Sequence, residues 1–470
     1  MNKEYFKEFI DKNRDNILND LSALISIPSI NGPATEEYPL GEPVAKALDF
    51  TRDCAKGLGL EAENLGHLTE IKFGDSGETM CVAVHADVVP VGDGWDTDPF
   101  ELVEKNGKLY GRGTLDDKGP AIAAIYALAA VKSTGAVPKK QIRLLVGGEE
   151  ETGMNDVKKY VEENGLPDYG LTPDGGFPII NAELGVLFSK MDFAEMKEKG
   201  AVKLLNLTAG RAFNCVPDSC ECTISVGDRD SLLRAETVIS EFAENCPELK
   251  YDVKNNKITL SSTGVSAHGS VPWKGKSALY TVLAVLKKIY VATSSENAFV
   301  DFCDRCIGSD DGKKLGIYFA DELSGTISTN CGMCGVSDGK AFITFDIRVP
   351  VSASVKEINE KLKKLAAEYG AEYTVDQLEE GIHVSKDSAF MQSVASSYEK
   401  ATGKKAEFLC ERGSTYAKSF GGKGVAFGPI DEKDPSAGGN LHTVNEYIDK
   451  EALFELAVIY AVTLYDFCCM

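Results

Sequence analysis

Five short polar segments constrain the fold more than any other feature, because they lie far apart and carry groups that are useful together. Each contains an acid or an imidazole, and two of the chain's 5 histidines fall within the set. Such groups match the needs of a two-metal hydrolase, provided that the fold brings them together. The segments are His85-Ala86-Asp87, Gly111 to Gly119, Glu149 to Gly153, Pro173-Asp174-Gly175 and Leu441-His442.

Length and charge narrow the class of protein. A chain of 470 residues is too long for one hydrophobic core, so we expect two domains. Its net charge of -22 repels nucleic-acid phosphates and anionic membranes. No apolar run reaches the ~20 residues that cross a bilayer, and the N-terminus lacks a signal-peptide pattern. We therefore expect a cytoplasmic protein, with neither nucleic acid nor membrane as a partner.

Strand and helix patterns at both ends of the chain predict one α/β domain made from two separate segments. The apolar run 80–85 is typical of a buried parallel strand, and an Ala-rich helical run follows at 121–131. The α/β pattern returns near the C-terminus, in the piece that contains His442. We expect residues 1–181 and 384–470 to form a discontinuous catalytic domain, with a central sheet covered by helices.

The middle of the chain has a different pattern. In residues 182–383, strand-like and helix-like runs are mixed and contain no comparable cluster of acids and imidazoles. This predicts an inserted α+β domain.

Four of the 13 cysteines raise the question of a structural zinc site. Cys303, Cys306, Cys331 and Cys334 have the paired C-x-x-C spacing of a zinc ribbon. However, charged residues such as Asp304 crowd the first pair, and no knuckle glycine follows it. We favour buried thiols over a structural zinc. The odd cysteine count also argues against a disulfide framework.

The polar segments follow strands and open helices, where an α/β sheet places its active site. His85 and Asp87 point the same way from one strand, so Asp87 can orient the imidazole or a catalytic glutamate. Asp116 can give one oxygen to each of two cations. Its neighbour Asp117 suits a helix N-cap instead.

Two adjacent glutamates predict a division of roles. Glu150 and Glu151 cannot act from the same direction, so one should bind metal and the other should hold the attacking water as general base. Asp174 lies in a rigid Pro–Gly turn, and His442 follows a glycine-rich approach. Each residue alone suits an ordinary loop, and the combination favours a metal site.

In this order, the motifs resemble those of the di-zinc metallopeptidase superfamily of aminoacylases, carboxypeptidases and dipeptidases. The shared pattern is H-x-D, G-R-G-x-x-D-x-K-G, E-E-x-G, a later Asp and a C-terminal His, and it covers nearly the whole chain. The chain is most similar to the large monomeric dipeptidases of lactic bacteria, with residues 182–383 as an unusually big lid. The resemblance implies a monomer that binds a dipeptide and two Zn²⁺ ions, for which Mn²⁺ or Co²⁺ can substitute.

The resemblance also implies the role of each residue at this site. Glu150 would be the general base, supported by Asp87, and the Asp116–Asp117 peptide bond would be cis. Two ligand trios would share one aspartate. They are His85, Asp116 and Asp174 for one metal, and Asp116, Glu151 and His442 for the other.

Three further residues in the inserted domain match the resemblance. By that resemblance, His268 would stabilise the tetrahedral oxyanion, and Asn214 and Arg348 would bind the substrate's C-terminal carboxylate. A lid that holds both ends of a short substrate favours a dipeptidase.

Two alternatives remain at this point. An N-acyl amino acid amidohydrolase, of the aminoacylase or desuccinylase type, would use the same metal chemistry. A silent metal-binding or peptide-binding protein is disfavoured, because it would have no use for Glu150 or His268.

Overall fold

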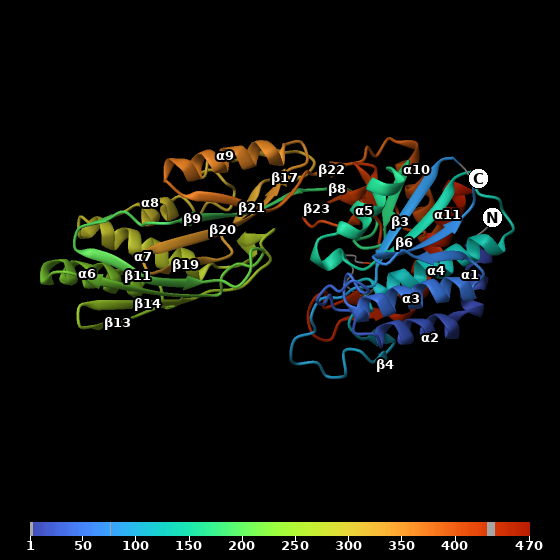
Figure 1. The fold of residues 1–470 in the computed structure, drawn as a ribbon, viewed down its shortest axis with the longest axis horizontal. Coiled ribbons are helices and arrows are strands. Elements are labelled where there is room, and N and C mark those ends of the chain that lie inside the picture. Colours follow the sequence, from blue (N-terminus) through green and yellow to red (C-terminus); the bar gives the residue numbers. More distant parts are fainter. Residues whose placement is uncertain (1–2, 76, 430–437) are drawn as a thin grey trace. The chain divides into compact units, whose positions relative to one another are not determined.

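The structure, a computed structural model, describes residues 3–75, 77–429 and 438–470. The chain divides into two compact units, which are labelled by element in Figure 1. Unit 1 joins Met1–Ala182 to Ile382–Met470, and unit 2 is the intervening Glu183–Gly381. The unit boundaries therefore lie at 182/183 and 381/382, against predicted domain boundaries at 181/182 and 383/384.

Unit 1 is built on a mixed nine-stranded sheet. Its strands are β1 (Glu61–Asn64), β2 (Leu68–Phe73), β3 (Thr79–His85), β6 (Gln141–Gly147), β7 (Tyr169–Thr172), β8 (Ile179–Glu183), β22 (Ile382–His383), β23 (Phe408–Glu411) and β24 (Gly424–Ala426). They run in the order β1-β2-β6-β3-β7-β24-β8-β22, with β23 paired to β8. The central strand β3 is parallel to both of its neighbours, β6 and β7.

Helices cover both faces of this sheet, which explains why β3 is apolar along nearly its whole length. Successive strand residues point to opposite faces. Val82 and Val84 belong to the larger core, with helices α4 (Lys118–Ser133) and α11 (Lys450–Cys468). Cys81 and Ala83 pack on the other face, with α5 (Asn155–Asn164) and η3 (Tyr416–Phe420). The helical elements of unit 1 are α1 (Lys3–Lys12), α2 (Arg14–Ile25), α3 (Glu42–Gly57), α4 (Lys118–Ser133), η1 (Glu150–Thr152), α5 (Asn155–Asn164), α10 (Ala389–Thr402), η3 (Tyr416–Phe420) and α11 (Lys450–Cys468).

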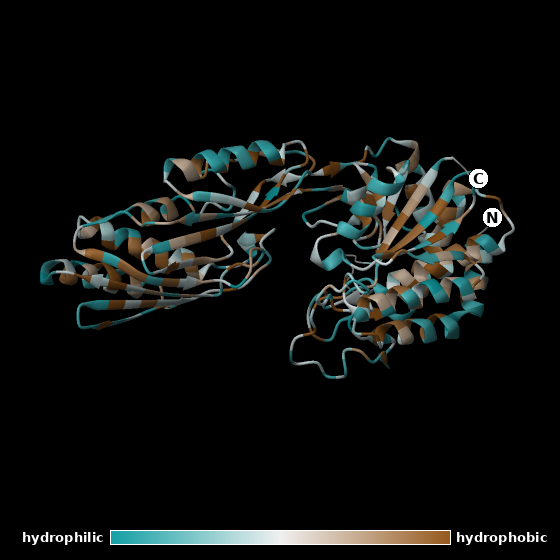
Figure 2. Cartoon of the chain, viewed as in Figure 1, coloured by the Kyte–Doolittle hydropathy of each residue, from teal (hydrophilic) through white to brown (hydrophobic). Residues whose placement is uncertain are grey.

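The two separate segments of unit 1 share one hydrophobic core. Helix α4 is buried from Lys118 to Val131, as expected for a helix surrounded by protein on all sides. It packs against α11 near the C-terminus, and side chains of both helices belong to the same core. Figure 2 shows the central strands as largely hydrophobic, whereas hydrophilic faces appear on the outer helices.

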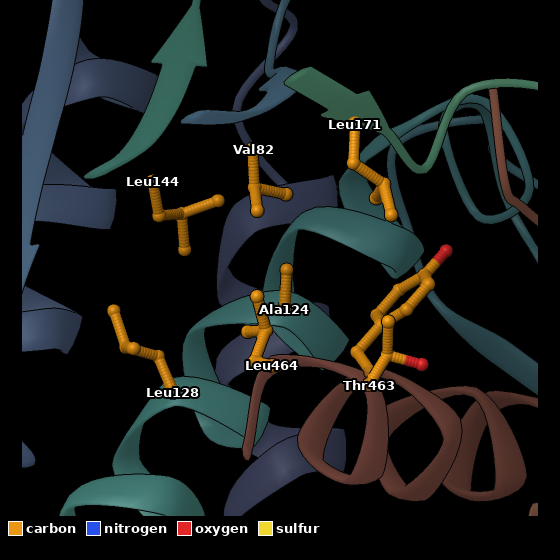
Figure 3. A pocket seen from close by; sticks show the side chains of 8 residues that line it. Val82, Ala124, Leu128, Leu144, Leu171, Thr463 and Leu464 are labelled. Carbon is orange, nitrogen blue, oxygen red and sulfur yellow. The ribbon is translucent and has the colours of Figure 1, made fainter. Parts of the chain in front are cut away.

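A small apolar pocket lies within this core, between the central strands and helices α4 and α11 (Figure 3). Its lining has no charged side chain, so it offers nothing to bind a metal ion or to polarise a substrate. We interpret it as a gap in core packing. The lining residues are Val82, Ala124, Leu128, Leu144, Leu171, Tyr460, Thr463 and Leu464.

A second, four-stranded sheet joins the C-terminal segment of unit 1 to its N-terminal segment. Its strands are β4 (Val103–Lys105), β5 (Lys108–Tyr110), β25 (Gly438–Gly439) and β26 (Tyr447–Asp449), in the order β25-β26-β5-β4. The turn between β25 and β26 carries His442. This sheet therefore fixes the turn beside the segment that begins at Gly111.

Unit 2 is an α+β unit whose nine-stranded sheet is antiparallel throughout the described pairings. Its strands are β9 (Gly185–Phe193), β11 (Val202–Ala209), β12 (Ser219–Val226), β13 (Leu249–Lys254), β14 (Lys257–Thr263), β18 (Ser328–Asn330), β19 (Cys334–Ser337), β20 (Lys340–Val349) and β21 (Glu372–Glu379). Buried and more exposed residues alternate along β12, as expected for a sheet with one covered face.

Helices and short strands complete unit 2. Helix α7 packs on β12 and β14, and α9 packs on β9 and β21. The helical elements are α6 (Arg229–Glu244), η2 (Pro272–Lys274), α7 (Ala278–Ala292), α8 (Ala298–Asp304) and α9 (Val355–Glu368), and the short strands are β10 (Glu198–Lys199), β15 (Glu296–Asn297), β16 (Ala320–Asp321) and β17 (Gly325–Thr326). The predicted fold class, a discontinuous α/β domain with an inserted α+β domain, is confirmed.

No helix in the described ranges is long and apolar enough to cross a membrane.

Candidate metal centre

The site begins where two parallel strands of unit 1 end at the same edge of the sheet. His85 is the last residue of β3, and its register partner is Gly147, the last residue of β6. Shortly after β6 the chain forms η1, which contains both candidate glutamates. Parallel pairing therefore brings the His85 and Glu150–Thr152 segments together.

Asp87 fixes the two segments relative to each other. Its side chain is fully buried, and its carboxylate accepts the backbone N–H groups of Glu150 and Glu151, each at 3.2 Å. The carbonyl oxygen of Asp87 lies 2.9 Å from Nδ1 of His85. This contact favours a proton on Nδ1, which makes Nε2 the candidate ligand atom. Asp87 thus contacts the His85 imidazole through its carbonyl oxygen and the glutamate turn through its carboxylate.

The structure brings together all five predicted metal ligands, in two groups that share Asp116. Within each group the candidate ligand atoms lie within 4.8 Å of one another. One oxygen of Asp116 lies 2.9 Å from His85 Nε2, and the other lies 2.8 Å from His442 Nε2. A carboxylate whose two oxygens face two imidazoles is arranged to bridge two cations. The groups are His85, Asp116 and Asp174, and Asp116, Glu151 and His442.

The peptide bond between Asp116 and Asp117 is cis, as the family resemblance implied. Asp117 occupies the N-cap position of α4, but in the described structure its side chain makes no capping hydrogen bond. Its carboxylate instead accepts the backbone N–H of His85 at 3.1 Å. Its role is therefore to hold the end of β3.

Buried negative charge dominates the electrostatics of the site. Burial raises the pKa of Glu150 well above its ordinary value, and repulsion from Asp174 adds to this. Burial also raises the pKa of Glu151. Burial opposes ionisation of Asp116, yet the hydrogen bonds and positive charge of His442 and His85 together lower the pKa of Asp116 overall. Burial lowers the pKa of His442, but the hydrogen bonds and charge attraction of Asp116 and Glu151 together outweigh this and raise the pKa to about 11.

Divalent cations fit this donor set. Oε1 of Glu151 is buried and makes no hydrogen bond within the described residues, although His442 Nε2 lies 3.3 Å away. Imidazole nitrogens and carboxylate oxygens are the ligands that Zn²⁺, Mn²⁺ and Co²⁺ bind. A cation here would offset the repulsion among the carboxylates. His85 is fully buried whereas the His442 side chain is 50% exposed, so the site is open on the His442 side.

A buried aspartate supports the glutamate loop. One oxygen of Asp156 accepts the N–H groups of Gly148 at 2.7 Å and Glu149 at 3.0 Å, and the Tyr416 hydroxyl at 2.7 Å. Neither Asp156 nor Tyr416 has a role predicted from the sequence. They lie 260 positions apart in no shared motif, so only the fold pairs them.

Two motif positions without a predicted role are also structural supports of the site. Lys118 is fully buried and donates to the carbonyl groups of Leu24 and Ile27, at 3.0 and 2.7 Å. Burial lowers the pKa of Lys118 to about 7. Arg112 pairs with Glu446. Glu446 has no predicted role either, and the one sequence signal for it is its place four residues after His442.

The three residues predicted in the inserted domain gather in one region of unit 2. Arg348, in β20, is buried and forms two hydrogen bonds with Asp346, at 2.7 and 3.2 Å. Nδ1 of His268 lies 2.7 Å from the Ser270 hydroxyl. Asn214 lies next to the His268 loop, because its carbonyl accepts the Gly269 N–H at 2.7 Å.

Strand β18 joins these pieces. Ser328 donates to the Ser270 carbonyl at 3.0 Å and is the register partner of Arg348. The amide of Asn330 donates to the carbonyl groups of Phe213 and Cys215, at 2.9 and 3.1 Å. The segments with Asn214, His268 and Arg348 are therefore anchored to the same short strand.

The four paired cysteines lie close together as thiols, with hydrogen bonds between Cys303 and Cys334 and between Cys306 and Cys331. Each is 0 or 1% exposed within the hydrophobic core of unit 2. They are absent from the groups of described residues that could hold a metal ion. A hydrogen bond with Cys331, together with burial, raises the pKa of Cys306 well above its ordinary value. These findings favour the buried-thiol interpretation for Cys303, Cys306, Cys331 and Cys334.

Known proteins are similar to this chain in sequence and in fold. The Beta-Ala-Xaa dipeptidase of Lactobacillus delbrueckii subsp. lactis is 31% identical over 471 residues, which cover 98% of each chain. The crystal structure of human carnosine dipeptidase 1 superposes with a TM-score of 0.59 at 15% identity, covering 99% of this chain and 98% of that one. The dipeptidase Dug1p of Saccharomyces cerevisiae gives a TM-score of 0.60 at 15% identity, with the same coverage.

The model of peptidase family M20/M25/M40 matches residues 81–466. That range begins in β3, ends in α11 and includes all five candidate ligands. The predicted resemblance to metallopeptidases, and to the large dipeptidases of lactic bacteria in particular, is confirmed. This chain belongs to peptidase family M20/M25/M40.

Proposed function

We propose that this protein is a dipeptidase that depends on two divalent metal ions, with zinc as the metal. The observation that carries the proposal is the position of Asp116, whose two carboxylate oxygens face His85 and His442. The name of the Lactobacillus relative, a Beta-Ala-Xaa dipeptidase, supports the choice of substrate class. When bound, the two cations would polarise the substrate carbonyl and lower the pKa of the attacking water.

In this proposal Glu150 is the general base. It belongs to neither ligand trio, is largely buried, and is fixed through its backbone N–H by Asp87. Burial raises its pKa, which suits a carboxylate that must hold a proton for part of the reaction. Glu150 takes a proton from water as the oxygen attacks the peptide carbonyl. It then gives that proton to the leaving amine as the C–N bond breaks.

We assign substrate binding to three residues of unit 2, which we propose as a lid domain on a catalytic unit 1. Asn214 and Arg348 bind the C-terminal carboxylate of the dipeptide, and His268 stabilises the oxyanion. The anchoring of all three segments to β18 supports this assignment. The pairing of Arg348 with Asp346 holds the guanidinium in one orientation, which a bidentate contact with a carboxylate requires. The cytoplasmic location and the monomeric state stay predictions.

The test is hydrolysis of a dipeptide panel, including β-alanyl dipeptides, beside the matching N-acetyl amino acids. The metal content of the purified protein is measured first. The protein is then assayed before chelation, after chelation and after zinc is restored. We expect dipeptide cleavage that chelation removes and zinc restores. Cleavage of the N-acetyl compounds alone would assign the site to an amidohydrolase. Two bound metals without any turnover would indicate a metal-binding protein.

A further inference from the structure

The turn that carries His442 needs external support, because its backbone is strained. Asn440, His442 and Asn445 have φ angles of 62, 56 and 59°, in the left-handed region that residues other than glycine rarely adopt. Asn445 anchors the turn on one side through Asp96, whose N–H donates to the Asn445 amide oxygen at 2.9 Å. The next residue, Glu446, provides the other anchor.

Glu446 binds the loop that presents Asp116. Its side chain is fully buried, and Oε1 accepts three backbone N–H groups, from Gly113 at 3.0 Å, Leu115 at 2.9 Å and Asp116 at 3.1 Å. Its backbone carbonyl also accepts the N–H of Gly111 at 3.1 Å. One residue therefore accepts four backbone hydrogen bonds from a single ligand loop.

Arg112 balances the buried charge of Glu446. Nη1 of Arg112 lies 2.6 Å from Oε2 of Glu446, and its side chain is 1% exposed. Its guanidinium carbon lies 5.4 Å from the centre of the Trp95 ring. Nε and Nη2 of Arg112 are buried without hydrogen-bond partners in the described structure, so Glu446 is the acceptor on which this guanidinium depends.

We propose that Glu446, paired with Arg112, is a positioning residue that sets the distance between Asp116 and His442. It thereby determines the affinity for the metal ion that Asp116, Glu151 and His442 would bind. The proposal rests on the proposed metal-dependent function. Its physical basis is that one side chain links the Asp116 loop to the turn with His442, although more than 300 positions separate the two segments. Residues that orient metal ligands in this way typically change metal affinity by about 10–100-fold when mutated.

The experiment is a titration of metal-free protein with Zn²⁺ in competition with a chromophoric chelator, with thermal unfolding of the same metal-free samples. In Glu446→Gln, the amide can accept from the three loop N–H groups or from Arg112, but not from both. We expect affinity for one of the two zinc ions to fall by at least tenfold. Glu446→Asp keeps the charge on a shorter side chain, and we expect a smaller loss. It also provides the measurement if the glutamine variant does not fold.

Glu70→Gln is the matched control. Glu70 is another buried carboxylate of unit 1, bound to the Tyr160 hydroxyl and to Lys72, and it touches neither ligand loop. We expect this variant to lose thermal stability without losing zinc affinity. Unchanged zinc affinity in both Glu446 variants would overturn the proposal, and so would an equal loss of affinity in Glu70→Gln. Wild-type protein that binds two zinc ions but cleaves no dipeptide would refute the proposed function and leave the positioning role intact.

Discussion

Two sets of residues in this chain have the composition of a metal site, but they lie in different surroundings in the structure. The acid and imidazole set is scattered from residue 85 to residue 442, yet its candidate ligand atoms converge within 4.8 Å in each trio. The cysteine set has compact motif spacing, yet it lies within the core of unit 2 and joins no candidate metal group among the described residues.

The difference lies in what surrounds each set. The ligands of unit 1 follow strand ends and are held by other polar groups, such as Asp87, Asp117 and Glu446. The thiols of unit 2 lie within an apolar core and hydrogen-bond with one another, Cys303 with Cys334 and Cys306 with Cys331. Burial in such a core favours the neutral thiol over the thiolate. We therefore take the polar support around the candidate ligands, and not motif spacing alone, as the feature that predicts a metal site.

The largest effect is expected from removing the shared ligand. Asp116→Ala takes one donor from each trio, so we expect it to lose both metals and reduce dipeptide hydrolysis by more than the ~10²–10⁴-fold typical of a lost general base. Metal analysis of the purified variant, beside steady-state kinetics, checks this. Two retained metals would show that Asp116 is not the bridge.

Glu150→Ala should separate catalysis from metal binding. Because Glu150 belongs to neither trio, we expect the variant to retain two metals while kcat falls by about 10²–10⁴-fold. Glu151→Ala is the comparison, since it should lose one metal as well as activity. If Glu150→Ala loses metal and Glu151→Ala does not, the two roles are reversed.

His268→Ala tests whether unit 2 contributes to the reaction. An oxyanion contact is worth about 10²–10³-fold in kcat, so we expect a loss of that size with both metals retained. His383→Ala provides a control, because no predicted role falls on that histidine. Equal kcat values for the two variants would remove His268 from the mechanism.

Cys303→Ser should have the smallest effect on metal content and activity. It tests the cysteine set, as the preceding variants test the acid and imidazole set. We expect no loss of metal, and a decrease in the free energy of unfolding of about 1–3 kcal/mol, because a hydroxyl replaces a buried thiol. Metal analysis and chemical unfolding give the two values. Loss of one metal per chain would reopen the structural zinc interpretation.

The sequence predicted the fold class, and it singled out the candidate ligands that the structure brings together, for an identifiable physical reason. Buried parallel strands are continuous apolar runs, and polar residues directly after such a run mark the active edge of the sheet. The run that ends at His85 and the one that ends at Gly147 both carry this signal. Register then places them side by side.

What the sequence did not reveal is the polar support around those ligands. Asp156, Tyr416 and Glu446 act through contacts between segments that lie 260 or more positions apart, for which no local pattern exists. Asp117 was expected to suit an N-cap, and its side chain instead holds the His85 backbone. A side chain's choice between such partners depends on the tertiary fold around it.

We propose that the acid and imidazole set of unit 1 binds two metal ions and that the cysteine set of unit 2 binds none. The most direct measurement is anomalous diffraction at the zinc absorption edge from crystals of zinc-loaded protein. We predict two zinc peaks, one on each side of the Asp116 carboxylate, and no peak among the four thiols of unit 2. A zinc peak at Cys303, Cys306, Cys331 and Cys334, or the absence of a pair at Asp116, would contradict the account.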